Sequence, residues 1–196
     1  MNIQKLEDHL RPSCSIRDNR VSVDYWMEDT AEPEDFLNIV LLLTHPSLHR
    51  IGSSILQNLR DFGETKDIAS RWHSVYTGIA VISNRETPSH VDSNGRPEWY
   101  DLLTVKGSHS PRSSRLELPE MGLTLAYGPG TVVALSGQIF QHRVGFWGDG
   151  DRICYARFMR DEVRNWFGVE PGEWMTQGYY AQHLSEELKR NKGFII

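Results

Sequence analysis

The chain from Trp72 to Phe158 carries a succession of short β-rich runs, and turn-forming residues close each run. The turns include Asn-Gly, Gly-Pro-Gly, Ser-Gly and Gly-Asp-Gly, which are typical of connections between neighbouring antiparallel strands. This pattern favours a sandwich or barrel over alternating β and α units. We predict a mainly β, α+β fold with flanking helices and a double-stranded β-helix (jelly roll) core. The predicted strands are residues 75–83, 98–105, 115–118, 123–127, 131–135, 139–144 and 152–158.

Helical patterns flank this β-rich region on both sides. Residues 34–43 follow Pro33 with mostly apolar positions and with acids in the first turn, which predicts a largely buried helix. A second helix is predicted over 47–62, with Ser47 as its N-cap. The tail predicts a short helix followed, after a break, by an amphipathic helix. We therefore expect one compact domain made of a helical support (1–71), a jelly-roll core (72–160) and a helical tail (161–196).

Charge and hydropathy limit the function classes. The chain has 196 residues and a formal charge of −5, and the acidic stretch 21–35 contains no Lys or Arg. Any binding of nucleic acid must therefore be local. The longest apolar run, 36–43, is far shorter than the ~20 residues of a membrane span, and the N-terminus lacks a secretory pattern. Two cysteines, Cys14 and Cys154, are too few for a disulfide framework, so we expect a soluble intracellular protein without a membrane partner.

The most informative motif is His90-Val91-Asp92. On an extended segment a two-residue spacing points the imidazole and the carboxylate to the same face. His142 follows 52 positions after His90 in another strand-like run, which completes a set of two histidines and one aspartate. Such a facial triad suits iron(II), because it leaves open coordination positions, whereas zinc would prefer four closed ones. The alternative for the His-Asp pair alone is a surface turn. The other histidines are assigned surface or capping roles, and His109 a solvated position in a Ser-rich loop.

Arg152 opens the last predicted strand, ten residues after His142. We expect it beside His142 on a neighbouring strand, where an inward guanidinium would need an anionic partner. The alternative is a surface salt bridge with Asp149 or Asp151.

Together these residues resemble the Fe(II)/2-oxoglutarate-dependent dioxygenases, in which an HxD motif, a distal histidine and a basic residue occur in this order. More narrowly, the chain over roughly residues 72–165 looks like the fungal, transposon-linked branch of the TET/J-binding-protein family. The segments that carry the resemblance are Thr77-Gly78-Ile79, Ser83-Asn84-Arg85, residues 90–103, residues 127–133 and residues 150–160.

The resemblance implies two cofactors, Fe(II) and 2-oxoglutarate, with molecular oxygen as co-reactant. His90, Asp92 and His142 would hold the iron, and Arg152 would pair with the C5 carboxylate of 2-oxoglutarate. Cys154 stands where many relatives have a hydroxyl. The partner of the C1 carboxylate stays open, with Asn84 and Arg85 as candidates.

The family oxidises methyl groups on nucleic-acid bases, so the implied substrate is DNA with methylated bases, a duplex from which the base is flipped. Oxidation of 5-methylcytosine and demethylation of N6-methyladenine are both compatible with such a site, and a DNA substrate implies a nuclear protein. Phe158, six residues beyond Arg152, matches the aromatic that stacks on the base in related enzymes. The cationic segment 106–115 could hold phosphates, or it could be a solvated hairpin connection. The remaining predicted substrate contacts are Asn94, Arg96, Trp99, Tyr100, Arg112 and Arg115.

Three alternatives stay open from the sequence. Phe158, and one of Trp99 and Tyr100, could be core aromatics. The acidic composition also leaves room for a 2-oxoglutarate dioxygenase that hydroxylates a protein or a small molecule. The third alternative, a jelly-roll binding module without enzymatic activity, is disfavoured by the intact set of four residues.

Overall fold

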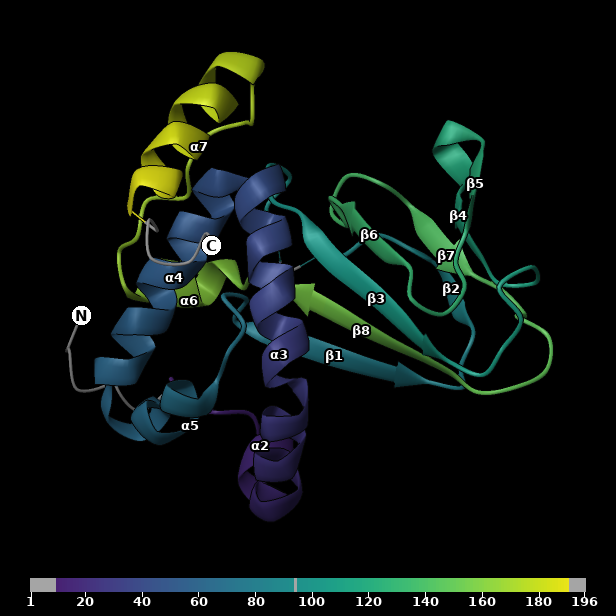
Figure 1. The fold of residues 1–196 in the computed structure, drawn as a ribbon, viewed down its shortest axis with the longest axis horizontal. Helices are drawn as coiled ribbons and strands as arrows, with labels where there is room; N and C mark the ends of the chain where they lie inside the picture. The colour runs from purple at the N-terminus through teal and green to yellow at the C-terminus, as the bar shows by residue number, and fades with distance from the viewer. Residues whose placement is uncertain (1–9, 94, 191–196) are drawn as a thin grey trace. The chain divides into compact units, whose positions relative to one another are not determined.

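The computed structural model describes residues 10–93 and 95–190, and the chain divides into two compact units. One unit contains the helices up to Val75 together with the segment from Glu162 onward, and the other runs from Tyr76 to Asp161 and contains the strands (Figure 1). The described residues form helices and two antiparallel sheets, which confirms the predicted α+β class. The predicted boundaries at residues 71 and 160 remain predictions of domain organisation.

The helical unit is built around one long helix, α3 (Arg20–Thr44). The prediction that this helix starts after Pro33 is wrong, because α3 continues through the proline. A proline inside a helix removes one hydrogen bond. Here Met27, Leu37 and Leu41 are buried on both sides of it, so packing outweighs that loss. The other helices are α2 (Cys14–Asp18), α4 (Pro46–Asp61), α5 (Lys66–Arg71), α6 (Asp161–Trp166) and α7 (Gln177–Arg190).

The predicted cap of α4 also differs from the structure. The side chain of His45, rather than Ser47, caps the helix, because its Nδ1 accepts a hydrogen bond from the Leu48 N–H at 3.2 Å. Ser47 lies inside the first turn, where it is buried and its Oγ is 3.4 Å from the Tyr179 hydroxyl. None of the helices in the described ranges has the length and apolar character that crossing a bilayer requires.

The β unit contains two four-stranded antiparallel sheets among its described residues. The first has the order β1-β8-β3-β6 and the second the order β2-β7-β4-β5. Two strands, β4 and β8, have the predicted bounds, whereas β2 was not predicted, since it is short and contains Pro88. The strands are β1 (Gly78–Ser83), β2 (Thr87–His90), β3 (Asp101–Gly107), β4 (Arg115–Leu118), β5 (Leu123–Ala126), β6 (Val132–Leu135), β7 (His142–Val144) and β8 (Arg152–Phe158).

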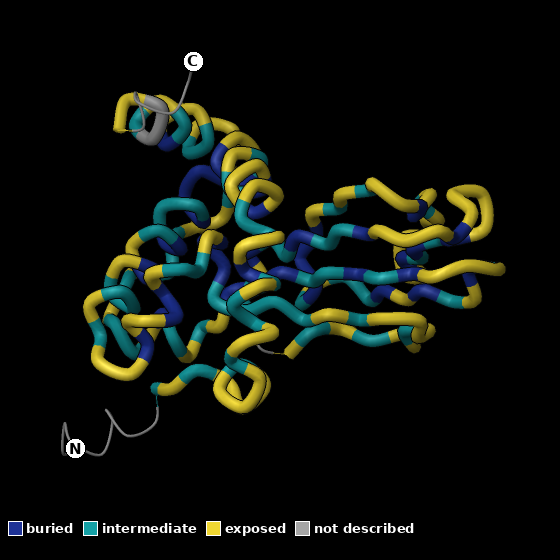
Figure 2. The backbone as a smooth tube through the Cα atoms, turned by 60° about the horizontal axis from the view of Figure 1, so that its bottom comes forward, coloured by how far each residue is buried: buried dark blue, intermediate teal, exposed yellow. Residues whose placement is uncertain are grey.

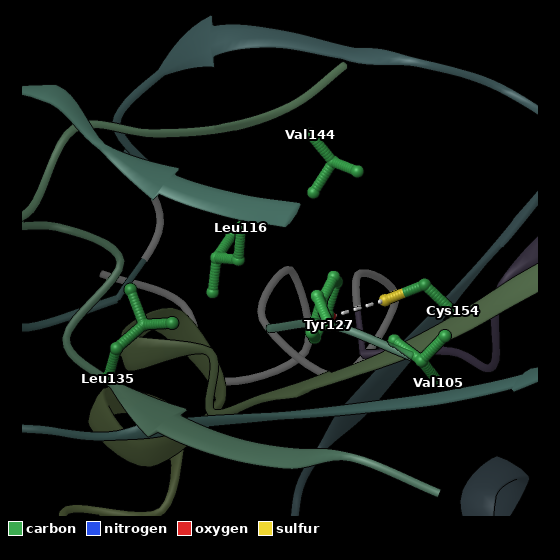
Figure 3. Close-up of a cluster of buried hydrophobic side chains, with 6 residues drawn as sticks. All are labelled: Val105, Leu116, Tyr127, Leu135, Val144 and Cys154. Carbon is green, nitrogen blue, oxygen red and sulfur yellow. Dashed lines mark hydrogen bonds between the residues drawn. The ribbon is translucent and has the colours of Figure 1, made fainter. Parts of the chain in front are cut away.

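Residues from both sheets form one hydrophobic core (Figure 3). The first sheet supplies Val105, Leu135 and Cys154, and the second supplies Leu116 and Val144. Tyr127, which follows β5, joins them, and its hydroxyl is 3.3 Å from the Cys154 sulfur. Buried residues lie inside each unit, and exposed residues lie on the outer positions of helices and strands as well as on the connections (Figure 2). The packed faces of the two sheets therefore define an inward side of the strands. This inward side determines which of the polar residues described below point into the interior.

Candidate metal centre and cosubstrate site

The antiparallel pairing of β2 with β7 brings the two histidines of the sequence motif together. His90 ends β2 and lies directly opposite His142, the first residue of β7, and the centroids of their rings are 4.3 Å apart. The carboxylate of Asp92 approaches both: Oδ1 is 3.5 Å from His90 Nε2, and Oδ2 is 3.8 Å from His142 Nε2. One ligand atom from each residue lies within 4.8 Å of the other two. The three side chains therefore converge on one point, as the spacing predicts.

Backbone carbonyls orient both imidazole rings. His90 Nδ1 is 2.9 Å from the Pro88 oxygen, and His142 Nδ1 is 2.9 Å from the Phe140 oxygen. A carbonyl oxygen can only accept, so both Nδ1 atoms donate a hydrogen bond, and both Nε2 atoms lie on the side of the Asp92 carboxylate. This second hydrogen bond is the usual way in which proteins fix the tautomer of a metal-binding histidine. Two imidazole nitrogens and one carboxylate oxygen form a donor set that fits iron(II) and leaves open positions.

Gly137 holds the HxD loop in place. Its carbonyl accepts a hydrogen bond from the Asp92 N–H at 2.8 Å, and its own N–H donates to Asp101 Oδ2 at 3.3 Å. A Cβ at this position would lie 2.2 Å from Asp92 Oδ2 and 2.7 Å from Asp101 Oδ2. The glycine therefore allows two carboxylates to approach the same peptide. Burial, and then the charge of Asp92, raise the pKa of Asp101 to about 7, although the Gly137 hydrogen bond acts in the opposite direction.

Arg152 is 1% exposed at the start of β8. The prediction that it lies on a strand next to His142 is wrong, because β7 and β8 belong to different sheets and the 145–151 connection crosses between them. Within residues 10–93 and 95–190 its guanidinium forms no salt bridge with Asp149 or Asp151. Asp151 instead accepts a hydrogen bond from Asn84 Nδ2 at 2.9 Å.

The Arg152 guanidinium is held by rings and by a carbonyl, and it has an unused donor. It lies over the rings of Tyr127 and Trp147, at 5.3 and 5.8 Å from their centroids, and Nη1 is 3.4 Å from the Arg85 oxygen. Nε is buried and has no hydrogen-bond partner among residues 10–93 and 95–190. A buried cation with a free donor requires an anion, and a carboxylate of 2-oxoglutarate fits that requirement.

The other predicted cosubstrate residues have structural contacts around Arg152. Asn84 Oδ1 accepts a hydrogen bond from the Arg152 N–H at 2.8 Å, and Asn84 has a positive φ of 47°. Arg85 offers its carbonyl, while its side chain is exposed. Cys154 is buried in the core, and burial raises the pKa of its thiol. A neutral thiol bonded to Tyr127 is a weak donor, so it is a poor substitute for a hydroxyl.

Phe158 lies on the inward face of the first sheet. Its ring covers Gly78, the residue opposite it on β1, where a Cβ would come 2.6 Å from the ring. On the other side, the register of β3 with β8 pairs Leu102 with Arg157 and so sets Asp101 next to Phe158. The Asp101 carboxylate in turn lies near the Asp92 carboxylate at Gly137. Phe158, Asp101 and Asp92 therefore form a row that connects the aromatic ring with the three converging side chains.

The remaining predicted substrate residues divide into two groups. Arg96 pairs with Glu98 and with Asp161, and it lies 5.9 Å from the ring centroid of Trp99, which is itself buried. The Tyr100 carbonyl accepts a hydrogen bond from the Tyr76 hydroxyl at 3.0 Å. By contrast, Arg112 is exposed and Arg115 is half-buried, and Asn94 lies outside the described residues. Their predicted contacts with DNA stay predictions.

His109 corrects another expectation, because it is 2% exposed rather than solvated. Its Nδ1 is 3.0 Å from the Asp151 oxygen. Two glycines allow these backbone segments to come this close. Gly107 and Gly150 both have positive φ, and a Cβ on either would clash with the facing backbone. Sequence reasoning also missed Asp101, Gly137 and Ser114, since nothing in the local pattern marks them.

Comparison with known proteins supports the fold. No protein-family model matches the chain, and no curated protein matches it either. Seventeen chains of solved structures do match. One of them, NgTET1 in complex with 5mC DNA, is 19% identical with a TM-score of 0.55, and the match covers 93% of this chain and 63% of that one. The chain thus spans less than two thirds of this neighbour and has a TET-like fold.

Proposed function

We propose that this protein is an Fe(II)/2-oxoglutarate-dependent dioxygenase that oxidises the methyl group of a methylated DNA base. The observation that carries the proposal is the convergence of His90, Asp92 and His142 in the same β unit as Arg152, a buried cation with an unpaired donor. The proposal includes a double-stranded β-helix core and membership of the fungal branch of the TET/J-binding-protein family. It also includes a nuclear location, because the substrate is DNA.

The residues of the site have separate roles in this proposal. His90, Asp92 and His142 hold Fe(II) with their Nε2 and carboxylate atoms, and Arg152 binds the distal carboxylate of 2-oxoglutarate. When bound, this pair supplies the oxidation of a C–H bond by molecular oxygen, with succinate and carbon dioxide as co-products. The Pro88 and Phe140 carbonyls keep the two imidazoles in the tautomer that binds a metal.

Phe158 is the residue on which the flipped base would stack. Its ring occupies an inward position beside Asp101, and the guanidinium of Arg160 lies 5.4 Å from its centroid. Stacking on an aromatic ring is worth ~1–3 kcal/mol per base and tolerates either cytosine or adenine. NgTET1 was solved with 5mC DNA, which supports DNA as the substrate. The exposed Arg112 and the half-buried Arg115 are the cations proposed to contact phosphates.

The test is mass spectrometry of nucleosides after incubation with duplex and single-stranded DNA carrying 5-methylcytosine or N6-methyladenine. We expect 5-hydroxymethylcytosine from the first base, or loss of N6-methyladenine with release of formaldehyde from the second. The matched control is Asp92→Ala, which removes one of the three proposed iron ligands.

Two outcomes would contradict the proposal at different levels. Succinate formation without any change in DNA nucleosides would favour a protein or small-molecule substrate, an alternative that the acidic stretch 21–35 and the net charge of −5 support. Absence of 2-oxoglutarate binding and turnover by the iron-loaded protein would exclude the dioxygenase itself.

A further inference from the structure

Ser114 and Arg152, both in the β unit, each bury a hydrogen-bond donor that has no partner among the described residues. Ser114 is fully buried and its Oγ forms no hydrogen bond, and the same is true of Nε of Arg152, which is 1% exposed. Burying an unpaired hydroxyl or guanidinium N–H is unfavourable, so native proteins rarely keep such atoms without a ligand or a function. Both residues belong to the same unit: Arg152 begins β8 of the first sheet, and Ser114 directly precedes β4 of the second.

Tyr127 connects the two unpaired atoms. The ladder of β4 with β5 pairs Arg115 with Ala126, and its continuation sets Ser114 opposite Tyr127, whose N–H donates to the Ser114 oxygen at 3.1 Å. Opposing residues of a ladder point to the same face. That face is the inward one, because Leu116, two residues further along β4, packs against Tyr127 in the core (Figure 3). The Arg152 guanidinium lies over the same tyrosine ring, 5.3 Å from its centroid.

The other polar groups near Arg152 are less suited to bind an anion. The Cys154 thiol lies beside the Tyr127 hydroxyl at 3.3 Å and is a weak donor. His109 also has a buried nitrogen without a partner, Nε2. Its Nδ1 lies 3.0 Å from the Asp151 carbonyl and carries the proton, and in that neutral tautomer Nε2 is an acceptor. Ser114 differs from these groups because its buried hydroxyl can donate and has no hydrogen-bond partner among the described residues.

We propose that the Ser114 hydroxyl donates a second hydrogen bond to the distal carboxylate that Arg152 binds. The inference rests on the proposed function, since it takes 2-oxoglutarate as the ligand. Ser114 would then take the place of the hydroxyl that relatives carry two residues after the arginine, but from the opposite sheet.

The experiment measures binding rather than turnover. The Mn(II)-loaded 196-residue chain is titrated with 2-oxoglutarate by calorimetry, in the wild type and in Ser114→Ala and Ser114→Cys. A hydrogen bond to a charged group is worth enough that its loss should raise the Kd about tenfold or more. The affinity for Mn(II) should not change. The melting temperature of the ligand-free Ser114→Ala protein should be unchanged or higher, because the substitution removes a buried hydroxyl without a partner.

Two controls separate this role from packing. Ser47→Ala removes a buried hydroxyl from α4, where it lies 3.4 Å from Tyr179, and should leave the Kd for 2-oxoglutarate unchanged. Titration with 2-oxobutyrate, which lacks the distal carboxylate, should give the same Kd for the wild type and Ser114→Ala.

The contradicting outcomes are distinct. If the wild type binds 2-oxoglutarate and both Ser114 variants bind it equally well, the inference is wrong and the proposed function stands. An equal loss of affinity for 2-oxobutyrate would also overturn it, because the effect would then not depend on the distal carboxylate. If the wild type does not bind 2-oxoglutarate at all, the proposed function fails, and the inference fails with it.

Discussion

Replacing Gly137 by alanine should abolish metal binding while the fold stays intact. The backbone of Gly137 is not in the left-handed region, so alanine can adopt it, and the clash of the new Cβ falls on side-chain ends. The atoms it would meet are Oδ2 of Asp92 at 2.2 Å and Oδ2 of Asp101 at 2.7 Å. Both carboxylates can rotate away, but Asp92 then leaves the point on which His90 and His142 converge.

The size of the displacement sets the expected effect. An ordinary contact of a Cβ is at least 3.4 Å, so Asp92 Oδ2 must move by about 1.2 Å. Metal–ligand distances tolerate only about ±0.2 Å, so the carboxylate can no longer complete the site. Changes in residues that merely support a ligand cost ~10–100-fold in metal affinity, and we expect at least ~100-fold here. The free energy of unfolding of the metal-free protein should change by no more than about 1 kcal/mol, because alanine also restricts the unfolded chain.

Calorimetric titration with Mn(II), or with Fe(II) under anaerobic conditions, measures the effect, and circular dichroism reports on the fold. Gly145→Ala is the matched control, since a Cβ at Gly145 would meet no atom within 4 Å and its φ is ordinary. If Gly137→Ala binds the metal with wild-type affinity and stoichiometry, then either Asp92 is not a ligand or the Gly137 contact does not constrain it.

The same geometry supports four further predictions. Asp92→Ala should abolish metal binding and turnover with the fold intact, and comparable turnover by the folded variant would exclude the triad. Arg152→Lys should raise the KM for 2-oxoglutarate, because an ammonium group cannot form the bidentate contact of a guanidinium, and an unchanged KM in Arg152→Ala would make this arginine structural. Phe158→Ala should raise the KM for DNA more than that for 2-oxoglutarate, whereas a lower melting temperature with unchanged kinetics would assign the ring to the core. Asp101→Asn should become more stable relative to the wild type as pH rises from about 4 through 7. The reason is that the folded-state pKa of Asp101 is raised to about 7, so its stabilising contribution is lost on ionisation, and a constant difference in the melting temperature of the metal-free proteins would refute this.

Part of the fold follows from local patterns in the sequence. β4 and β8 have the predicted bounds. Buried and partly buried positions alternate throughout β4 and over the first residues of β8, as they do in an extended segment between two environments. Pro33 shows the limit of local rules, because a proline argues against a helix interior and only packing of buried residues on both sides of it sustains α3.

The candidate site also combines features that local sequence determines with features that depend on strand pairing. The spacing of His90 and Asp92 determines by itself that their side chains share a face, and the sequence order of these residues with His142 and Arg152 suggests the chemistry. The sequence does not determine which strands pair. Sheet pairing sets His142 opposite His90 but puts Arg152 on the other sheet, which no spacing rule predicts.

The roles of the supporting residues Gly137 and Ser114 depend on tertiary structure alone. Gly137 lies 45 positions from Asp92, and Ser114 lies 38 positions from Arg152. Their roles arise from steric exclusion and from burial without a hydrogen-bond partner. A residue type and its neighbours in the chain carry information about backbone conformation, because the interactions that set that conformation act over a few residues. Close approach and loss of water depend on which distant segments pack together, so they exist only once both sheets have formed.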